Sequence, residues 1–270
     1  MGISALYAAA SGMKSLDTKL NVVANNLANI DTVGFKGSRV NFEDLLYEVR
    51  RQPGGLNGFE EPVPLGILVG LGVQVSGTQL DFETGTLNPT DHPTDIAIRG
   101  NGFFQVQTVY NGQEQIAYTR AGNFIVNSEG QLVLANSEGS RLEPPIQIPE
   151  DATSPPQISQ DGRVSVRQQG SNQLTEVGQI ELARFVNPEG LLQVGKNLFI
   201  ETDASGPPIK GNPQQDGLGE IVQGHLEASN VDPVRELVEL IFTQRAFEMN
   251  SQSIQSADES MRVVGNLRRF

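Results

Sequence analysis

The sequence lacks several residue types on which common kinds of protein chemistry depend. Among its 270 residues there is no cysteine and no tryptophan, and there are only two histidines, His92 and His225. Without cysteine, disulfide frameworks and zinc–thiolate sites are excluded. Asp91 and Asp95 flank His92, but a loop rich in Asp, Thr and Pro is typical of turn formation. The sequence therefore predicts no catalytic residue, no metal site and no cofactor, and it indicates a protein that is not an enzyme.

Basic residues are also few. The chain has 19 Lys and Arg against 32 Asp and Glu, which gives a formal charge of −13. Nucleic acids and anionic membranes are bound by clustered Lys and Arg, so this balance argues against both as partners. The first 30 residues contain no basic stretch followed by a continuous apolar run, and no apolar run is long enough to span a bilayer. We expect no cleavable secretory signal and no direct membrane insertion.

The two ends of the chain share an apolar pattern with helical spacing. Near the N-terminus, apolar residues recur at alternating steps of three and four, as in a coiled-coil seam: Leu6, Ala9, Met13, Leu16, Leu20, Val23, Leu27 and Ile30. A second stripe lies near the C-terminus: Leu237, Leu240, Phe247, Ile254, Met261 and Val264. A helix with one apolar stripe must bury it against something, and the nearest candidate is the other terminal helix. We expect the two helices to pair through these seam positions.

The faces of the helices that point away from the seam carry few charges. Residues 1–30 contain only three charged side chains, and residues 249–257 contain none. Ser11 and Ser15 are on this outer face, together with amides on both helices: Asn21, Asn25, Asn29, Asn250, Gln252 and Gln255. Depletion of charge is a compositional mark of interface cores. We therefore expect the outer faces to be packed by other copies or by partners.

The middle of the chain has a different pattern, with alternating apolar residues and frequent turns. Residues 31–72 form a linker whose Pro- and Gly-rich stretch predicts an extended loop or loose hairpin: Gln52, Pro53, Gly54, Pro62, Pro64 and Gly66. Residues 42–49 fit a short helix or a strand equally well. Residues 73–223 alternate with period two between turns such as Asn111-Gly112, which predicts antiparallel strands. Residues 224–270 lead into the last helix, with Asp232 as its N-cap and Pro233 at its first position.

These patterns predict an α+β fold that is mainly β. The N-terminal helix (1–30) and the C-terminal helix (within 224–270) form a coiled-coil domain, and a central antiparallel β domain (73–223) is inserted between them.

Several motifs in this sequence resemble those of a known family. NVVANNLANIDTVGFK (residues 21–36) looks like the N-terminal signature of bacterial flagellar basal-body rod and hook proteins. The β-domain motifs of that family are similar to GTL (85–87), DIAIRGNGFFQV (95–106) and YTRAGNF (118–124). Its C-terminal signature resembles GHLEASNV (224–231) and ELVELIFTQRAFEMNS (236–251). Residues 42–54 and 65–73 are most similar to the distal rod members of the family.

The resemblance implies a structural function. The chain would be a subunit of the flagellar rod, most similar to the distal rod, and would assemble into a helical tube that transmits torque to the hook. The terminal helices would line the tube, and the Pro- and Gly-rich segment would contact neighbouring subunits. The implied partners are further copies of the chain, the proximal rod proteins, the hook protein, the periplasmic and outer-membrane rings, and the flagellar type III export apparatus. The implied location is the basal body in the periplasm.

Two alternatives remain open from the sequence. The chain could instead be a proximal rod or hook subunit of the same family. A more remote alternative is a secreted β-rich binding module that oligomerises through its helices.

Overall fold

The computed structural model describes residues 2–54, 64–169 and 173–267, and these residues form two compact units. Among these residues, the helical unit comprises 2–28, 38–54, 64–79 and 232–267, and the β unit comprises 29–37, 80–169 and 173–231. The expected fold class is confirmed in its coarse form, with a helix at each end of the chain and a mostly β centre.

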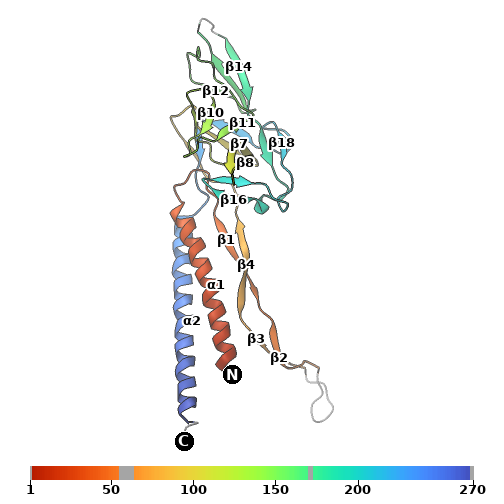
Figure 1. The fold of residues 1–270 in the computed structure, drawn as a ribbon, viewed down its shortest axis with the longest axis vertical. Coiled ribbons are helices and arrows are strands. Elements are labelled where there is room, and N and C mark those ends of the chain that lie inside the picture. The colour runs from red at the N-terminus through yellow and green to blue at the C-terminus, as the bar shows by residue number, and fades with distance from the viewer. Residues whose placement is uncertain (1, 55–63, 170–172, 268–270) are drawn as a thin grey trace. The chain divides into compact units, whose positions relative to one another are not determined.

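In its described residues, the helical unit contains two long helices and four strands. Its elements are α1 (Gly2–Ala28), β1 (Ser38–Asp44), β2 (Tyr47–Arg51), β3 (Ile67–Gly70), β4 (Val73–Leu80) and α2 (Pro233–Leu267). Strand β1 pairs with β4, and β2 pairs antiparallel with β3. Figure 1 shows α1 and α2 side by side, with the four strands in two successive ribbons. Residues 42–49, which the sequence left undecided, lie in β1, β2 and the turn between them.

The ends of the two helices follow from local chemistry. At the start of α2, Asp232 Oδ1 accepts hydrogen bonds from the backbone N–H groups of Val234 at 2.9 Å and Arg235 at 3.3 Å, which confirms the expected cap. Helix α1 ends at Ala28, so Ile30 lies beyond the helix. The chain turns there because Thr32 bonds back to Asn29 through backbone and side chain, and Gly34 adopts a φ of 67°.

The β unit is built from antiparallel strands, as the alternating pattern predicted. Its largest sheet has the order β16-β17-β8-β7-β11-β10-β9, with β15 pairing with β7 and β18. A three-stranded sheet has the order β12-β13-β14, and β19 pairs with β6 and β20 with β5. The bounds are β5 (Leu87–Pro89), β6 (Ile96–Arg99), β7 (Phe103–Tyr110), β8 (Gln113–Thr119), β9 (Phe124–Val126), β10 (Leu132–Leu134), β11 (Arg141–Glu143), β12 (Gln157–Ile158), β13 (Arg163–Arg167), β14 (Leu174–Gln179), β15 (Leu182–Arg184), the short 3-10 helix η1 (Pro188–Gly190), β16 (Leu192–Gly195), β17 (Leu198–Ile200), β18 (Ile209–Gly211), β19 (Glu220–Gln223) and β20 (His225–Glu227).

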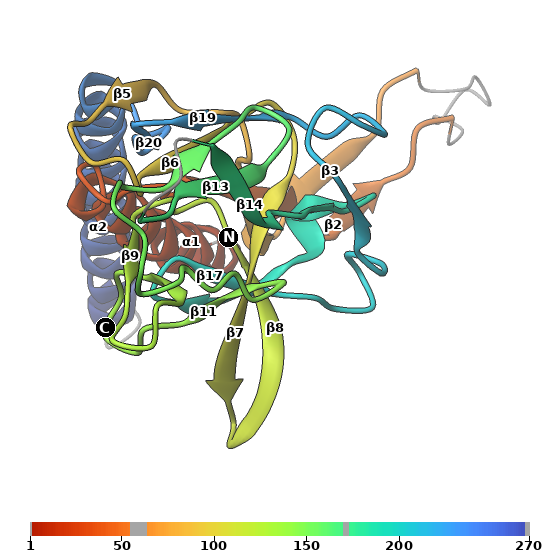
Figure 2. The ribbon, with the colours of Figure 1, turned by 90° about the horizontal axis from the view of Figure 1, so that it is seen from above.

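The longest hairpin shows how the turn residues determine register. Asn111 and Gly112 both have positive φ, at 52° and 78°, as a two-residue hairpin turn requires. Tyr110 consequently pairs with Gln113, and the register continues to Phe104 opposite Thr119. Figure 2 shows this β7–β8 hairpin extending beyond the rest of the β unit.

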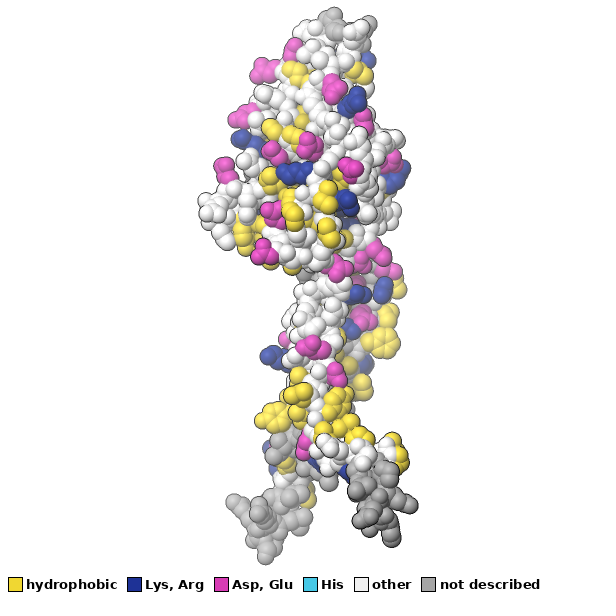
Figure 3. Space-filling view, turned by 90° about the vertical axis from the view of Figure 1, so that its right-hand side faces the viewer, with side chains coloured by type: hydrophobic (Ala, Val, Ile, Leu, Met, Phe, Trp, Pro, Cys, Tyr) yellow, Lys and Arg dark blue, Asp and Glu magenta, His cyan; other side chains and the backbone are white. Residues whose placement is uncertain are grey.

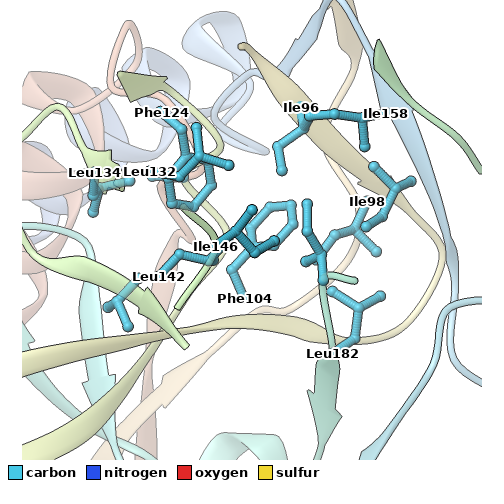
Figure 4. Packing of buried hydrophobic residues seen from close by; sticks show 14 of the residues in the cluster. Ile96, Ile98, Phe104, Phe124, Leu132, Leu134, Leu142, Ile146, Ile158 and Leu182 are labelled. Carbon is cyan, nitrogen blue, oxygen red and sulfur yellow. The ribbon is translucent and has the colours of Figure 1, made fainter. Parts of the chain in front are cut away.

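Alternate residues of β7 face two different hydrophobic clusters. Phe104 lies in the main core beside Phe124, with ring centroids 5.4 Å apart, among aliphatic residues of several strands (Figure 4). Its neighbour Phe103 points to the other side and packs with Phe185, Phe199 and Tyr118. The period-two alternation of this strand thus places one aromatic ring in each cluster.

Candidate assembly surface

Helix α1 packs on α2, and the two helices run antiparallel (Figure 1). Gly12 lies opposite the side chain of Asn250, and Lys19 forms an ion pair with Glu239. Among the predicted seam residues of α1, Val23 is buried, whereas the others on the helix are half-buried: Leu6, Ala9, Met13, Leu16, Leu20 and Leu27. Half-burial in a single chain leaves part of each of these apolar side chains available for a further contact.

The face that α2 turns toward α1 is more polar than the sequence indicated. Its buried and half-buried positions between residues 236 and 257 are Glu236, Glu239, Leu240, Thr243, Ala246, Phe247, Asn250, Ser251, Ile254 and Ala257. Leu240, Phe247 and Ile254 are thus on the buried side, whereas Leu237 and Met261 are exposed. The side chain of Val264 lies outside the described residues. The missed residues Glu236, Thr243 and Asn250 continue the heptad spacing of the apolar ones, and that spacing was the signal that could have found them.

The half-buried carboxyl group of Glu236 has a perturbed pKa. Burial raises the pKa of Glu236 above its usual value, and repulsion from Glu239 adds to this, while a hydrogen bond from Asn26 and the charges of Arg235 and Lys19 oppose it. The carboxylate is therefore less stable between the helices than it is in water.

Part of the outer face of α1 is covered by a strand of the same chain. Ser11 Oγ accepts a hydrogen bond from Val73 N at 3.3 Å, and Ser15 Oγ donates to Val73 O at 3.4 Å. A Cβ atom on Gly72 would lie only 2.1 Å from Ser11 Oγ, so strand and helix can approach this closely only with glycine there. At the end of α1, Asn26 bonds to both backbone groups of Ser38. The small residues Ser11 and Ser15 therefore accommodate β4, a contact that no local pattern in the sequence predicts.

The amides expected on the outer faces have different surroundings. Asn21, Asn25, Gln252 and Gln255 are exposed, and Asn250 lies opposite Gly12 on the side of α2 that faces α1. Asn29 accepts a hydrogen bond from the Thr32 hydroxyl and lies in the β unit.

Two sets of large apolar side chains in the helical unit are exposed to solvent. The outer stripe of α2 consists of Val234, Val238, Ile241, Phe242 and Met249. The apolar residues of the β2–β3 ribbon are Leu46, Tyr47, Val49, Leu65, Ile67 and Leu68. Figure 3 shows hydrophobic side chains gathered in the lower part of the view, in the region of this ribbon. An isolated two-stranded ribbon is marginal in water, and apolar patches of this kind mark interaction sites.

The predicted extended segment continues from this ribbon. Gln52, Pro53, Gly54 and Pro64 are exposed, and Pro62 lies outside the described residues. Gly66 is half-buried, and a Cβ atom there would lie 2.7 Å from both Arg51 O and the Pro53 ring. Arg51 also donates to Leu65 O at 3.2 Å, so the two sides of the segment lie close together where it meets the ribbon.

Relatives of known name match the chain over nearly its whole length. The flagellar basal-body rod protein FlgG of Caulobacter vibrioides is 43% identical over 98% of this chain and 100% of its own length. The protein of the same name from Bacillus subtilis is 37% identical over 99% of this chain and 100% of its own length. The flagellar basal-body rod protein FlgF of Caulobacter vibrioides is 35% identical over 96% of this chain and 95% of its own length.

The chain belongs to the flagellar basal-body rod protein family. Three family models match it: the flagella basal body rod protein at residues 6–36, the D1 domain of the flagellar hook protein FlgE/F/G at 97–166, and the C-terminal region of the flagellar basal body rod FlgEFG protein at 222–267. As a rod protein, the chain is a structural subunit located in the flagellar basal body, and its family self-assembles with other rod and hook proteins. Within the described parts of the chain, no helix is long and apolar enough to cross a membrane.

Proposed function

We propose that this rod protein is the distal rod subunit, which polymerises into a helical tube and transmits torque through the cell envelope to the hook. The assignment to the distal part of the rod rests on the sequence identities to two rod proteins of the same organism. In Caulobacter vibrioides, the relative named FlgG is 43% identical to the chain, and the relative named FlgF is 35% identical.

The exposed apolar surfaces of the helical unit support assembly through this unit. The outer stripe of α2 and the apolar residues of the β2–β3 ribbon would each be covered by neighbouring copies. The helices would then form a coiled-coil layer in which the seam residues and the outer amides contact several chains. Helical stability comes mainly from tertiary packing, so the two helices would gain most of theirs on assembly.

A repeated head-to-tail contact suits this function. When one surface of a subunit binds a different surface of the next and the rotation does not close, the product is a helical filament. Many such contacts, each burying apolar side chains, would resist shear between subunits, as torque transmission requires. We further propose that the subunit is exported through the type III apparatus without a cleavable signal. In the periplasm, the rod would contact proximal rod, hook and ring proteins.

Charge substitution in the seam tests the proposal. Leu20→Asp or Phe247→Asp would place a charge among apolar side chains, and burial of an unpaired charge is strongly unfavourable. In a strain lacking the native gene, we expect these variants to be exported but to leave rods incomplete and cells non-motile. The control Val186→Asp places the same charge at an exposed position of the β unit, where it should preserve swimming. Normal rods and swimming with Leu20→Asp and Phe247→Asp would contradict the proposal.

The alternative position, a proximal rod or hook subunit, is decided by location. Gold labelling of the chain in isolated basal bodies should mark the part of the rod next to the hook. Label at the membrane-proximal end of the rod would instead assign the chain to the proximal rod, and label in the hook itself would assign it to the hook.

A further inference from the structure

The β unit encloses three charged side chains that come from distant parts of the sequence. The side chains of Lys36 and Glu227 are both 0% exposed, and that of Arg120 is 3% exposed. Lys36 Nζ lies 2.6 Å from Glu227 Oε1, and Arg120 Nη1 lies 3.4 Å from Glu227 Oε2. The single carboxylate thus binds two cations, one through each oxygen.

The remaining polar groups of the cluster bind mainly to the backbone. Lys36 Nζ also donates to Glu83 O at 2.6 Å, and Glu227 Oε1 accepts from Gly85 N at 3.0 Å. Arg120 donates to Ile98 O at 3.4 Å and to Gly100 O at 2.7 Å. Its guanidinium carbon also lies 5.4 Å from the centre of the Phe103 ring, within cation–π range. Each of the three charged side chains thus also forms at least one hydrogen bond with the backbone of the β unit.

Backbone hydrogen bonds join the segments that carry these charges. Gly34 N donates to Glu227 O at 2.8 Å, and Asn230 N donates to Phe35 O at 3.4 Å. The Asn230 side chain accepts from Gly37 N at 2.8 Å and donates to Asp81 O at 2.9 Å. Residues 33–37 follow α1 in the chain, and residues 227–230 precede α2. The two connecting segments are thus fastened to each other and to residues 81–85.

An ion cluster is an expensive way to fill a protein interior. Buried charges lose their hydration, and well-packed apolar residues of similar size often stabilise a protein as much or more. Removing one partner of a buried cluster is nevertheless strongly destabilising, because the remaining charges are left buried and uncompensated. Burial lowers the pKa of Lys36 and of Arg120, and the neighbouring Glu227 carboxylate opposes this for both.

We propose that Lys36, Arg120 and Glu227 form a latch that holds the two connecting segments, residues 33–37 and 227–230, on the β unit. The latch depends on the pairing of both cations with the Glu227 carboxylate, and it fastens the two segments to residues 81–85 of the β unit. It keeps these segments folded in the single chain, before any copy has bound the helices.

Hydrogen exchange of the full-length single chain at low concentration tests the latch. In the native chain, amides of residues 33–37 and 227–230 should exchange as slowly as those of the β7–β8 core. Glu227→Gln leaves two buried cations without a carboxylate, so exchange in both segments should accelerate at least about 100-fold while residues 103–106 stay protected. Lys36→Met keeps the Arg120–Glu227 pair, so its effect should be smaller, and adding Lys36→Met to Glu227→Gln should recover part of the lost protection.

A core variant separates the latch from general stability. Leu142→Ala removes buried apolar volume and should lower protection against hydrogen exchange throughout the β unit. The loss in residues 33–37 and 227–230 should be no larger than the loss elsewhere in the unit. The proposal is overturned if Glu227→Gln leaves both segments protected against exchange. It is also overturned if the variant lowers the protection of both segments and of residues 103–106 equally. Should Glu227→Gln fail to fold, the same comparison is made with Lys36→Met. Because exchange is measured on the single chain, this result is independent of whether the chain forms the distal rod.

Discussion

The Lys36 ammonium and the Glu227 carboxylate lie 2.6 Å apart, although 191 positions separate the two residues in the sequence. Each stands in a motif that resembles a terminal signature of the rod family, residues 21–36 and 224–231, and Arg120 belongs to the β-domain motif at residues 118–124. Three motifs that are far apart along the chain therefore meet at one buried cluster. The charged side chains in these motifs neutralise one another in the protein interior, which gives a physical reason for two cations and one carboxylate at these positions.

Arg120→Lys should destabilise the β unit even though it keeps the charge. A lysine cannot reproduce the two-armed donation to Ile98 O and Gly100 O or the planar contact with Phe103. We expect a loss of about 1.5–3 kcal/mol in the free energy of unfolding, the range for hydrogen bonds to charged groups. Urea denaturation followed by circular dichroism measures it. Arg99→Lys, at an exposed ion pair with Glu220, is the matched control, and an equal loss there would contradict the account.

Gly34→Ala should be more damaging than the same change at another glycine of positive φ. At Gly34, with φ of 67°, a Cβ atom would lie 2.6 Å from backbone atoms of Arg120 and Ala121. At Gly112, with φ of 78°, nothing lies within 4 Å of that position. Gly112→Ala should therefore cost about 1 kcal/mol for backbone strain alone, and Gly34→Ala clearly more. Thermal unfolding compares the two, and similar melting temperatures for both variants would show that the close approach at Gly34 is relieved easily.

The stability of the helical unit should depend on pH through Glu236. Its pKa is raised in the folded state, mainly by burial, so folding favours the protonated carboxyl. Below the unfolded pKa the carboxyl is neutral in both states and there is no penalty; the penalty appears as the pH rises through the folded pKa. The helices should therefore be more stable near pH 4.5 than at pH 7. The difference is measured by hydrogen exchange of residues 240–254, as protection factors corrected for the intrinsic exchange rate at each pH.

Glu236→Gln should stabilise the helices at pH 7 and reduce the pH difference. Glu248→Gln changes an exposed carboxylate that pairs with Arg245, so it should leave the difference as it is in the native chain. An unchanged pH difference in Glu236→Gln would show that other groups cause it.

The regular parts of this chain could be predicted from sequence because short-range patterns determine them. The period-two runs at residues 96–98, 104–106 and 164–166 are strands, and the cap at Asp232 follows from the rule that a carboxylate accepts the first free N–H groups of a helix. Asn111-Gly112 supplied the register of the longest hairpin. Each of these features depends on residues within a few positions of one another.

The remaining features depend on contacts between residues that are far apart along the chain, and such contacts leave no periodic pattern in a single sequence. Thr243 and Asn250 are polar, so an apolar stripe does not include them, whereas it does include the exposed Leu237. Ser11 and Ser15 were interpreted as an outer face because nothing in the sequence indicates that β4 lies against α1. The latch was missed for the same reason, since charge alone does not show that Lys36, Arg120 and Glu227 are partners.

The central claim is that the helices of this rod protein make the contacts between subunits. Because the chain lacks cysteine, a single Phe242→Cys substitution gives one thiol, at a position that is 67% exposed in the outer stripe of α2. Val186→Cys, at a position 80% exposed in the β unit, is the control. Maleimide labelling rates are compared between the single chain and isolated rods. We predict rapid labelling of both variants in the single chain and at least a tenfold slower rate for Phe242→Cys, but not for Val186→Cys, in rods. Equal labelling of Phe242→Cys in rods and in the single chain would contradict the claim.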